Sequence, residues 1–175
     1  MKVLFLDIDG VCNTDYTKER TPIGFTGIEQ KFIKELKYIV ENTDALICLS
    51  STWRYEVDCS MKSTSKDGQY LIDCLNKEGL SLFSKTTTIY DKDPRGAEIV
   101  NFLETHKGVE GYVIVDDVLF RDFKPLGLLP HLIKTNPKEG LDKVRSDLAI
   151  RVLNGEIRMK EVYRLKFEEI LYETK

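Results

Sequence analysis

Val-Leu-Phe-Leu-Asp-Ile-Asp-Gly-Val, residues 3–11, is the stretch that decides the fold of this chain. Its four apolar residues predict a buried strand at about Lys2–Leu6, and Asp7 and Asp9 follow where that strand ends. Gly10 then lets the chain turn. Carboxylates two residues apart in an extended segment point to the same side, and they destabilise each other unless a cation or a shared proton compensates. The stretch therefore predicts a metal-assisted active site at the end of the first strand.

Apolar runs alternate with amphipathic segments along the rest of the chain, which is typical of an α/β domain with a parallel sheet. Further strands are expected at about Ala45–Leu49, Thr86–Tyr90, Tyr112–Val115 and Leu132–Lys134. One helix is expected to start at Thr26, because Glu29 three residues later completes a capping box. Other helices are expected at about Gln69–Glu78, after Asp93-Pro94, at Leu141–Leu153 with Leu141, Val144 and Leu148 on one face, and at Glu156–Lys175.

The size and composition limit the classes of protein that the chain can belong to. A length of 175 residues favours a single domain, with a core at about 1–153 and a helical extension at about 156–175. The net charge of −3 excludes a global basic field for nucleic acid, and no apolar stretch approaches the ~20 residues of a membrane span. The chain enters its first strand at once, which argues against a signal peptide, and its four cysteines lack zinc-site spacing. We therefore expect a cytoplasmic protein with reduced thiols and no membrane partner.

Polar residues collect where the predicted strands end. In open parallel sheets, ligands bind at the carboxyl ends of the strands. The second strand runs into Ser-Ser-Thr-Trp-Arg, residues 50–54, and the strand near residue 115 ends in Asp116-Asp117. Arg95 stands at an expected helix start. We therefore expect these side chains to meet Asp7 and Asp9 at one edge of the sheet.

This set of residues suits phosphoryl transfer, which needs a nucleophile in line with the leaving oxygen and neutralisation of the phosphoryl oxygens. Asp7 can attack phosphorus to form a phosphoaspartate, while Asp9 can protonate the leaving group and then deprotonate a water. Ser50 offers a hydroxyl donor, and Arg95 offers a permanent forked cation. Mg²⁺ binds carboxylates and substrate phosphate together, so its candidate ligands are Asp7 with one or both of Asp116 and Asp117.

Several of these residues also have purely structural interpretations. The hydroxyl groups of residues 50–52 could cap a helix, Asp116-Asp117 could form a turn, and Arg95 alone could be a surface charge. Trp53 could be a core aromatic or a wall of the site.

Arg54 has two interpretations of equal weight, because its guanidinium could bind a substrate anion or pair with a neighbouring acid. The candidate substrate-binding residues are Ser51, Thr52 and Arg54.

With these motifs in this order, the chain resembles the haloacid dehalogenase-like (HAD) phosphatase superfamily over about Lys2–Thr135. The motifs of that superfamily are a strand followed by DxD, a Ser or Thr ending the next strand, a basic residue at a helix start and an acidic pair after a strand. They are matched here by residues 3–11, Ser50, Arg95 and Asp116-Asp117. The resemblance implies a Rossmann-like three-layer sandwich, Mg²⁺ dependence and phosphatase chemistry.

The resemblance also implies roles for single residues. It suggests Asp7 as the nucleophile and Asp9 as the acid/base, with the Asp9 backbone carbonyl also facing the metal. It favours Asp117 as the metal ligand with Asp116 in support, and both are retained as candidates.

A finer resemblance is to the HAD-like domain of multidomain RNA-repair proteins, and it is carried by Leu49–Arg54, Arg95–Ile99 and Tyr112–Asp117. Two features depart from the superfamily pattern. Arginine replaces the usual lysine of the third motif, and Lys92 is a nearby competitor for that role. The usual Asp four residues after the metal ligand is replaced by Arg121, and Asp122, one residue further along, is the candidate substitute.

The segments 12–43 and 55–90 leave no room for a large cap domain, so we expect an open site that a polynucleotide end can reach. The leading hypothesis is a Mg²⁺-dependent phosphomonoesterase acting on a phosphorylated substrate such as a nucleotide or a nucleic-acid terminal phosphate. The alternative is a catalytically inactive module that binds Mg²⁺ or a phosphorylated partner. A receiver domain fits poorly, because its phosphoacceptor normally ends a later strand. The oligomeric state is not decided by the sequence.

Overall fold

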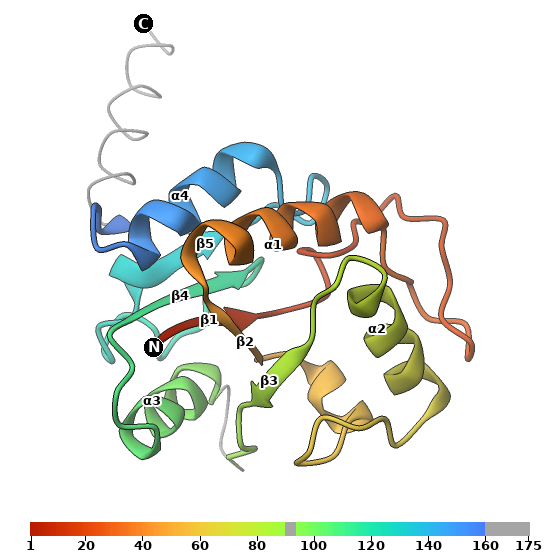
Figure 1. The fold of residues 1–175 in the computed structure, drawn as a ribbon, viewed down its shortest axis with the longest axis horizontal. Helices are drawn as coiled ribbons and strands as arrows, with labels where there is room; N and C mark the ends of the chain where they lie inside the picture. The colour runs from red at the N-terminus through yellow and green to blue at the C-terminus, as the bar shows by residue number, and fades with distance from the viewer. Residues whose placement is uncertain (90–93, 160–175) are drawn as a thin grey trace, which may run out of the picture.

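The computed structural model describes residues 1–89 and 94–159, in which strands and helices alternate (Figure 1). The strands are β1 (Lys2–Leu6), β2 (Leu46–Leu49), β3 (Leu82–Lys85), β4 (Gly111–Asp116) and β5 (Leu132–Lys134). The α-helices are α1 (Gln30–Thr43), α2 (Lys66–Asn76), α3 (Arg95–Thr105) and α4 (Lys143–Leu153). Two short 3₁₀ helices are η1 (Thr52–Glu56) and η2 (Leu129–His131).

The five strands form one parallel sheet in the order β3-β2-β1-β4-β5. β1 is central, and its Leu6 aligns with Leu49 of β2 on one side and with Val115 of β4 on the other. The chain builds the sheet outward from β1 to β3, and then crosses back to place β4 on the free side of β1. The direction of winding therefore reverses between β1 and β4, which is where ligands bind in sheets of this kind.

Alternating side chains of β1 supply two separate hydrophobic cores. Leu4 and Leu6 point into a core that α1, α2 and α4 complete, whereas Val3 and Phe5 point into a core with α3. All four side chains are fully buried. A strand covered on both faces needs an unbroken apolar run, and this is what residues 3–6 provide.

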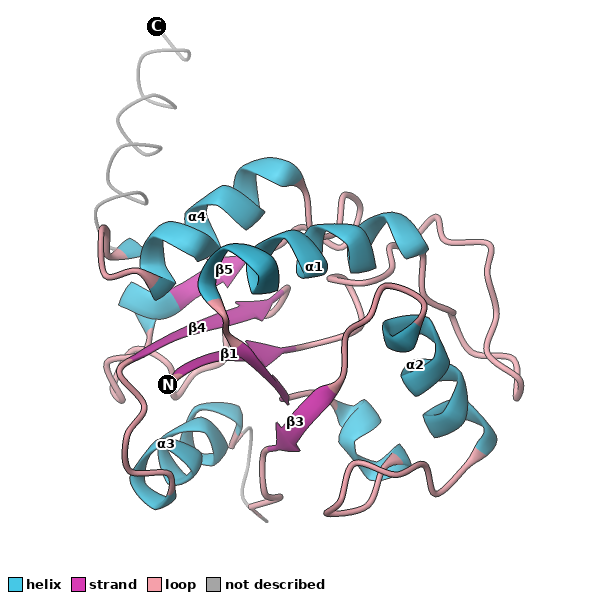
Figure 2. Cartoon of the chain, viewed as in Figure 1, coloured by secondary structure: helices cyan, strands magenta, loops and turns pink. Residues whose placement is uncertain are grey.

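The helices form the outer layers of a three-layer, Rossmann-like sandwich. Figure 1 shows α1 and α4 side by side on one face of the sheet and α3 on the other. The long connection between β1 and α1 is loop throughout (Figure 2), and α2 with η1 forms a small lobe beside β3. The described residues therefore contain no large cap domain over the ends of β1 and β4.

The expected start of the first helix at Thr26 is wrong. Helix α1 begins at Gln30 with Glu29 as its N-cap, and Thr26 pairs with Arg20 in an isolated antiparallel bridge. The Glu29 carboxylate accepts a hydrogen bond from the Thr17 hydroxyl and pairs with Lys31 at 2.6 Å. Because Thr26 lies outside the helix and the Glu29 side chain has other partners, the expected capping box does not form.

The strand expected at Thr86–Tyr90 lies earlier, at Leu82–Lys85. Thr86 still donates its N–H to the Leu49 carbonyl at 3.0 Å. β2 ends there and the chain turns into η1, so the β-branched residues that follow Thr86 have no strand to pair with. Tyr90 itself lies outside the described residues.

The last expected helices also need correction. Asp142 caps α4 by accepting a hydrogen bond from the Arg145 N–H at 2.8 Å, so Leu141 precedes the helix and helical spacing does not extend to it. Val144 consequently faces outward with 63% exposure. Residues 156–158 are not helical, and most of the helix expected at Glu156–Lys175 lies outside the described residues.

The α2 helix starts at Lys66, three residues before the expected Gln69, because the Ser65 hydroxyl accepts a hydrogen bond from the Gly68 N–H at 3.0 Å.

Among the described residues no helix has both the length and the apolar character needed to cross a membrane. All four cysteines lie in the described part of the chain and are free thiols.

Candidate active site

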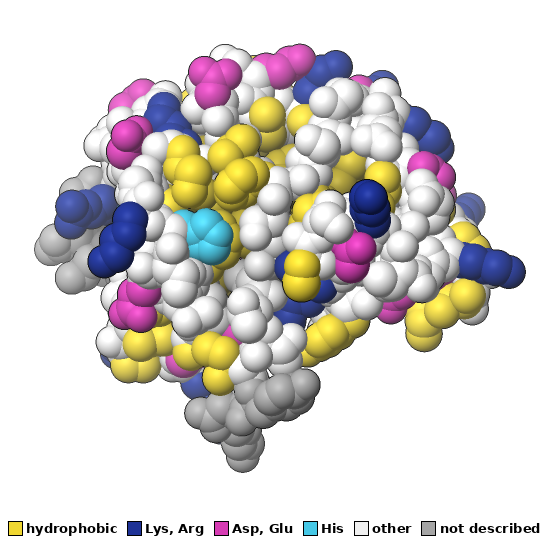
Figure 3. Space-filling view, turned by 60° about the horizontal axis from the view of Figure 1, so that its bottom comes forward, with side chains coloured by type: hydrophobic (Ala, Val, Ile, Leu, Met, Phe, Trp, Pro, Cys, Tyr) yellow, Lys and Arg dark blue, Asp and Glu magenta, His cyan; other side chains and the backbone are white. Residues whose placement is uncertain are grey.

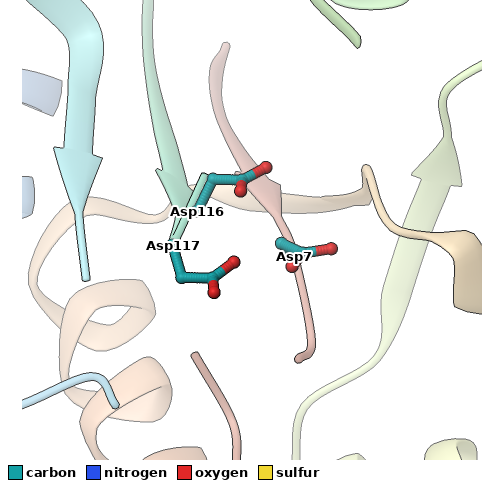
Figure 4. A group of neighbouring side chains, drawn as sticks. All are labelled: Asp7, Asp116 and Asp117. Carbon is teal, nitrogen blue, oxygen red and sulfur yellow. The ribbon is translucent and has the colours of Figure 1, made fainter. Parts of the chain in front are cut away.

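Three carboxylates meet at the point where the winding of the sheet reverses. Asp7 follows β1, Asp116 ends β4 and Asp117 comes next in the chain (Figure 4). One oxygen from each of the three lies within 4.8 Å of the others. Asp7 and Asp116 are buried, and Asp117 is partly exposed. The predicted meeting of these residues at one edge of the sheet is thus what the structure shows.

Arg95 is the cation at this cluster. It is the first residue of α3, and its Nη1 lies 3.4 Å from Asp7 Oδ1 and 3.6 Å from Asp116 Oδ2. Its guanidinium also lies over the Phe120 ring, 5.0 Å from the centroid. Arg95 is 8% exposed, so it is not the surface charge of the structural interpretation. Lys92, the competitor for this position, lies outside the described residues.

The negative charge of the carboxylate cluster is not fully compensated by the neighbouring cation. Burial and the neighbouring Asp116 raise the pKa of Asp7 to about 8, although Arg95 and a hydrogen bond from Ser51 act in the opposite direction. Burial also raises the pKa of Asp116 to about 6, and it raises the pKa of Asp117. One guanidinium therefore does not compensate three clustered carboxyl groups, and the site favours either bound protons or a further cation.

The Asp9 carboxylate lies apart from this group. β1 ends at Leu6, so Asp7 and Asp9 lie beyond the regular strand to which the i and i+2 relation applies. The exposed Asp9 side chain accepts one hydrogen bond from Asn13 Nδ2 at 2.8 Å and another from Trp53 Nε1 at 3.1 Å. Two donors thus fix the carboxylate at the mouth of the site. Trp53 belongs to the hydrophobic core and also lines a pocket beside Asp9, so both of its interpretations hold.

The two serines after β2 lie in different surroundings. The Ser50 hydroxyl is enclosed and has no hydrogen-bond partner among the described residues. The Ser51 hydroxyl lies close enough to Asp7 to lower its pKa by hydrogen bonding, and it also caps η1 by accepting from the Trp53 N–H at 3.4 Å. Thr52 is exposed beside this position. The Ser51 hydroxyl therefore lies near Asp7, and the role of hydroxyl donor predicted for Ser50 stays a prediction.

Arg54 pairs with an acid, which is one of its two predicted roles. Its Nη2 donates to Glu98 Oε1 at 2.7 Å and its Nη1 donates to the Ser51 carbonyl at 2.9 Å. Arg54 is 6% exposed and Glu98 is 1% exposed. The pair joins the loop after β2 to the first turn of α3, so it holds Ser51 and Arg95 in a fixed relation.

Replacing Arg54 with alanine is expected to destabilise the protein strongly, because Glu98 is then left buried without its partner. Loss of one member of a buried pair costs about 3–5 kcal/mol. The double variant Arg54→Ala/Glu98→Gln is expected to recover part of this loss, since the uncompensated charge is gone. Urea unfolding measures both.

The matched control is Arg151→Ala, which breaks the exposed pair of Arg151 with Glu156 at 3.6 Å and should cost at most about 1 kcal/mol. Equal effects of Arg54→Ala and Arg151→Ala would contradict the structural role of the buried pair.

Asp122 lies under the start of α3 instead of joining the carboxylate cluster. Its Oδ2 accepts a hydrogen bond from the Ala97 N–H at 3.0 Å, and a Cβ at Gly96 would approach its Cγ to 2.7 Å. Asp122 thus fixes the helix that carries Arg95. Glycine at position 96 is required for this close approach.

Two residues that the sequence did not single out support the turn after β1. Asn13 Oδ1 accepts a hydrogen bond from the Gly10 N–H at 2.9 Å, and the Thr135 hydroxyl donates to the Gly10 carbonyl at 2.8 Å. An Asn three residues after a glycine in a turn was a local signal that could have indicated the first contact. Thr135 follows β5 and carries no such signal.

The cluster fits a hard divalent cation. Its donors are carboxylate oxygens, which Mg²⁺ prefers, and the raised pKa values of Asp7 and Asp116 show that positive charge at this position would be stabilising. The site combines four groups. They are the buried Asp7 carboxylate, the Arg95 guanidinium that faces it, the Ser51 hydroxyl and the separately held Asp9 carboxyl group. Such a set can bind and cleave a phosphate ester.

One comparison with known proteins finds a match. The family model described as "HAD domain in Swiss Army Knife RNA repair proteins" matches residues 3–145, a range that includes every site residue named above. Searches of curated proteins and of solved structures found no match to the chain.

Proposed function

Because the chain belongs to the family of HAD domains in Swiss Army Knife RNA repair proteins, we propose that it is a Mg²⁺-dependent phosphomonoesterase that acts through a phosphoaspartate on Asp7. HAD-like domains are hydrolases at the level of the superfamily. The observation that carries the proposal is the cluster of the buried Asp7 and Asp116 with the partly exposed Asp117, and with Arg95 beside it.

The metal would be held by carboxylate oxygens of Asp7, Asp116 and Asp117, with the Asp9 backbone carbonyl as the fourth candidate. When bound, it supplies positive charge that neutralises the phosphoryl oxygens and lets Asp7 remain ionised. Arg95, at the start of α3, supplies a second and permanent positive charge beside the carboxylates that follow β1 and β4.

The residues of the chain then divide the reaction into two displacements. An Asp7 oxygen attacks phosphorus, the bond from phosphorus to the ester oxygen breaks, and the Asp9 carboxyl gives its proton to that leaving oxygen. Asp9 next accepts a proton from a water, whose oxygen attacks the phosphorus of the phosphoaspartate and releases inorganic phosphate from Asp7. Asn13 and Trp53 keep the Asp9 carboxylate in place for both proton transfers.

The open site favours a terminal phosphate on a bulky molecule. A nucleotide or the end of a polynucleotide is the substrate that we propose, and the RNA-repair description of the family supports it. Figure 3 shows Lys and Arg side chains scattered among acidic ones on one face instead of gathered in a basic tract. Recognition of the end group, and not of a long backbone, accords with this mixed surface.

The test is release of inorganic phosphate from an aryl phosphate, nucleoside monophosphates and oligonucleotides with 3′- or 5′-phosphates, with and without Mg²⁺. The proposal expects turnover that chelation of the metal abolishes. A protein that releases no phosphate from any of these substrates at any Mg²⁺ concentration would contradict the proposal.

Gly10 is expected to control the metal affinity. Its φ is +70°, and a Cβ there would come within 2.5 Å of Asp117 Cγ. Gly10→Ala should therefore displace the Asp117 carboxylate and weaken Mg²⁺ binding by about tenfold or more, the effect of moving one ligand. Isothermal titration of the metal-free protein with Mg²⁺ measures the affinity.

The control is Gly79→Ala, since Gly79 has nearly the same φ of +74° and no atom within 4 Å of its would-be Cβ. Both variants should lose about 1–2 kcal/mol of stability from backbone strain, and only Gly10→Ala should lose metal affinity. A Gly10→Ala protein that binds Mg²⁺ like Gly79→Ala would show that Asp117 is not a ligand.

A further inference from the structure

A pocket of about 480 Å³ opens beside the Asp9 carboxylate. Its aromatic walls are Phe25 from the loop before α1 and Trp53 and Tyr55 from η1, and Glu56 also lines it. The volume falls in the range of pockets that bind small molecules. Because Asp9 is the proposed acid for the leaving group, this pocket lies where the leaving group of the substrate would be.

Two of the aromatic rings are exposed, and local contacts hold the backbone of one residue and the ring of the other. Phe25 is 66% exposed and Tyr55 is 56% exposed. The backbone of Phe25 is fixed by two hydrogen bonds with Thr21, from the Thr21 N–H at 2.9 Å and to the Thr21 hydroxyl at 3.1 Å. The Tyr55 ring packs against the Arg54 guanidinium, 4.9 Å from the centroid. Exposed flat rings whose position is restrained offer surfaces on which a base can stack.

The charge of the pocket excludes a second phosphate group from it. Its acidic lining residues are Asp9, Glu56 and Asp67, and none of its lining residues among the described part of the chain is basic. A second pocket on the other side of Tyr55 has the opposite character, with Arg54 and Lys85 and no carboxylate. The first pocket therefore suits a neutral flat group whose polar edges donate hydrogen bonds to carboxylates, as the amino groups of nucleobases do.

We propose that this pocket binds the base of the nucleotide whose phosphate is removed, with stacking on Phe25 and Tyr55 and with Trp53 as the inner wall. This inference rests on the proposed function, because it names the part of the substrate that determines specificity. Phe25 is the specificity residue that can be altered without touching the carboxylate cluster.

The chain supplies its own reporter, since Trp53 is its only tryptophan. We would titrate the Asp7→Asn protein with Mg²⁺ present and follow Trp53 fluorescence, using adenosine 5′-monophosphate and, as the base-free probe, ribose 5-phosphate. Stacking is worth about 1–3 kcal/mol per base, so the adenine nucleotide should bind about 5- to 150-fold more tightly. Phe25→Ala in the same background should bring the two affinities to within about threefold.

The matched control is Ile23→Ala, because Ile23 is 62% exposed in the same loop and does not line the pocket. It should keep the preference for the adenine nucleotide. Equal binding of the two probes by the Asp7→Asn protein would overturn the inference, and so would a Phe25→Ala variant that keeps the preference.

A second arm separates this inference from the proposed function. In the otherwise wild-type enzyme, Phe25→Ala should lower kcat/KM for the adenine nucleotide and leave that for ribose 5-phosphate unchanged. Base-selective binding that depends on Phe25, without phosphate release from any substrate, would support the pocket and refute the phosphatase. Phosphate release that Phe25→Ala lowers equally for both substrates would refute the pocket and leave the phosphatase standing.

Discussion

Asp7→Asn is expected to abolish phosphate release and, at the same time, to stabilise the metal-free protein. The amide oxygen cannot attack phosphorus as a carboxylate does, so kcat/KM should fall by at least about 10³-fold. Asp7 has its pKa raised to about 8 by burial and by Asp116, which means that its ionised form is costly in the folded state. Removing the carboxyl removes that cost. The melting temperature at pH 7 without metal should rise by at least about 2–4 °C, or about 1 kcal/mol.

Phosphate release and thermal unfolding of the same protein test both parts of this prediction. Asp44→Asn is the control, because Asp44 is an exposed residue in the left-handed conformation at the end of α1, where asparagine is equally suitable. It should change neither quantity. The gain in stability should shrink as the pH falls toward 4, where the unfolded carboxyl is protonated too. An Asp7→Asn protein that is less stable than wild type at pH 7 would show that the ionised Asp7 carboxylate does not destabilise the folded state.

Mg²⁺ is expected to stabilise the protein far more at pH 8.5 than at pH 5.5. The folded pKa values of Asp7 and Asp116, about 8 and about 6, lie above the ordinary value of 3.8. Between about pH 4 and pH 8 the folded state therefore binds more protons than the unfolded state, so metal-free stability falls as the pH rises. Protons and metal compete for the same oxygens, so metal binding strengthens over the same range.

The size of the effect follows from mass action. At a Mg²⁺ concentration 100 times Kd, binding contributes about 2.7 kcal/mol, which raises the melting temperature by about 5–10 °C for a domain of this length. The gain should nearly vanish at pH 5.5. Asp116→Asn and Asp117→Asn should reduce it at pH 8.5, whereas Asp73→Asn, an exposed acid on α2, should not. A gain that is independent of pH would contradict assignment of the metal to this cluster.

The parts of the site that sequence predicted correctly are those that the sheet places. Asp7, Asp116 and Asp117 follow the ends of two strands that are each identified by an apolar run, and neighbouring parallel strands bring such ends together. Arg95 was predictable in the same way, because it starts the helix that precedes β4. Strand and helix ends are local properties, and the parallel topology turns them into a site.

The parts that sequence did not predict depend on backbone geometry outside the strands. The rule that places i and i+2 on one side stops at Leu6, so the position of the Asp9 carboxylate is decided by Asn13 and Trp53. The surroundings of Ser50 and Ser51 likewise depend on the turn from β2 into η1, which lies beyond the regular strand.

The partners in the supporting contacts were beyond prediction because these contacts join distant segments. The pair of Arg54 with Glu98 spans 44 residues and the hydrogen bond of Thr135 to Gly10 spans 125. Periodicity and capping patterns describe neighbours along the chain, and they carry no information about such pairs.

The covalent intermediate is the central claim, and acid quenching during turnover tests it most directly. An aryl phosphate, whose leaving oxygen departs without protonation, is mixed with the Asp9→Asn protein and Mg²⁺. Loss of the acid/base then slows mainly the hydrolysis of the intermediate, and the quenched protein is digested and analysed by mass spectrometry. The account predicts that the peptide containing Asp7 gains the mass of one phosphoryl group, and that Asp7→Asn/Asp9→Asn does not. Substrate consumption by the wild type without a phosphoryl group on Asp7 in either quenched protein would contradict it.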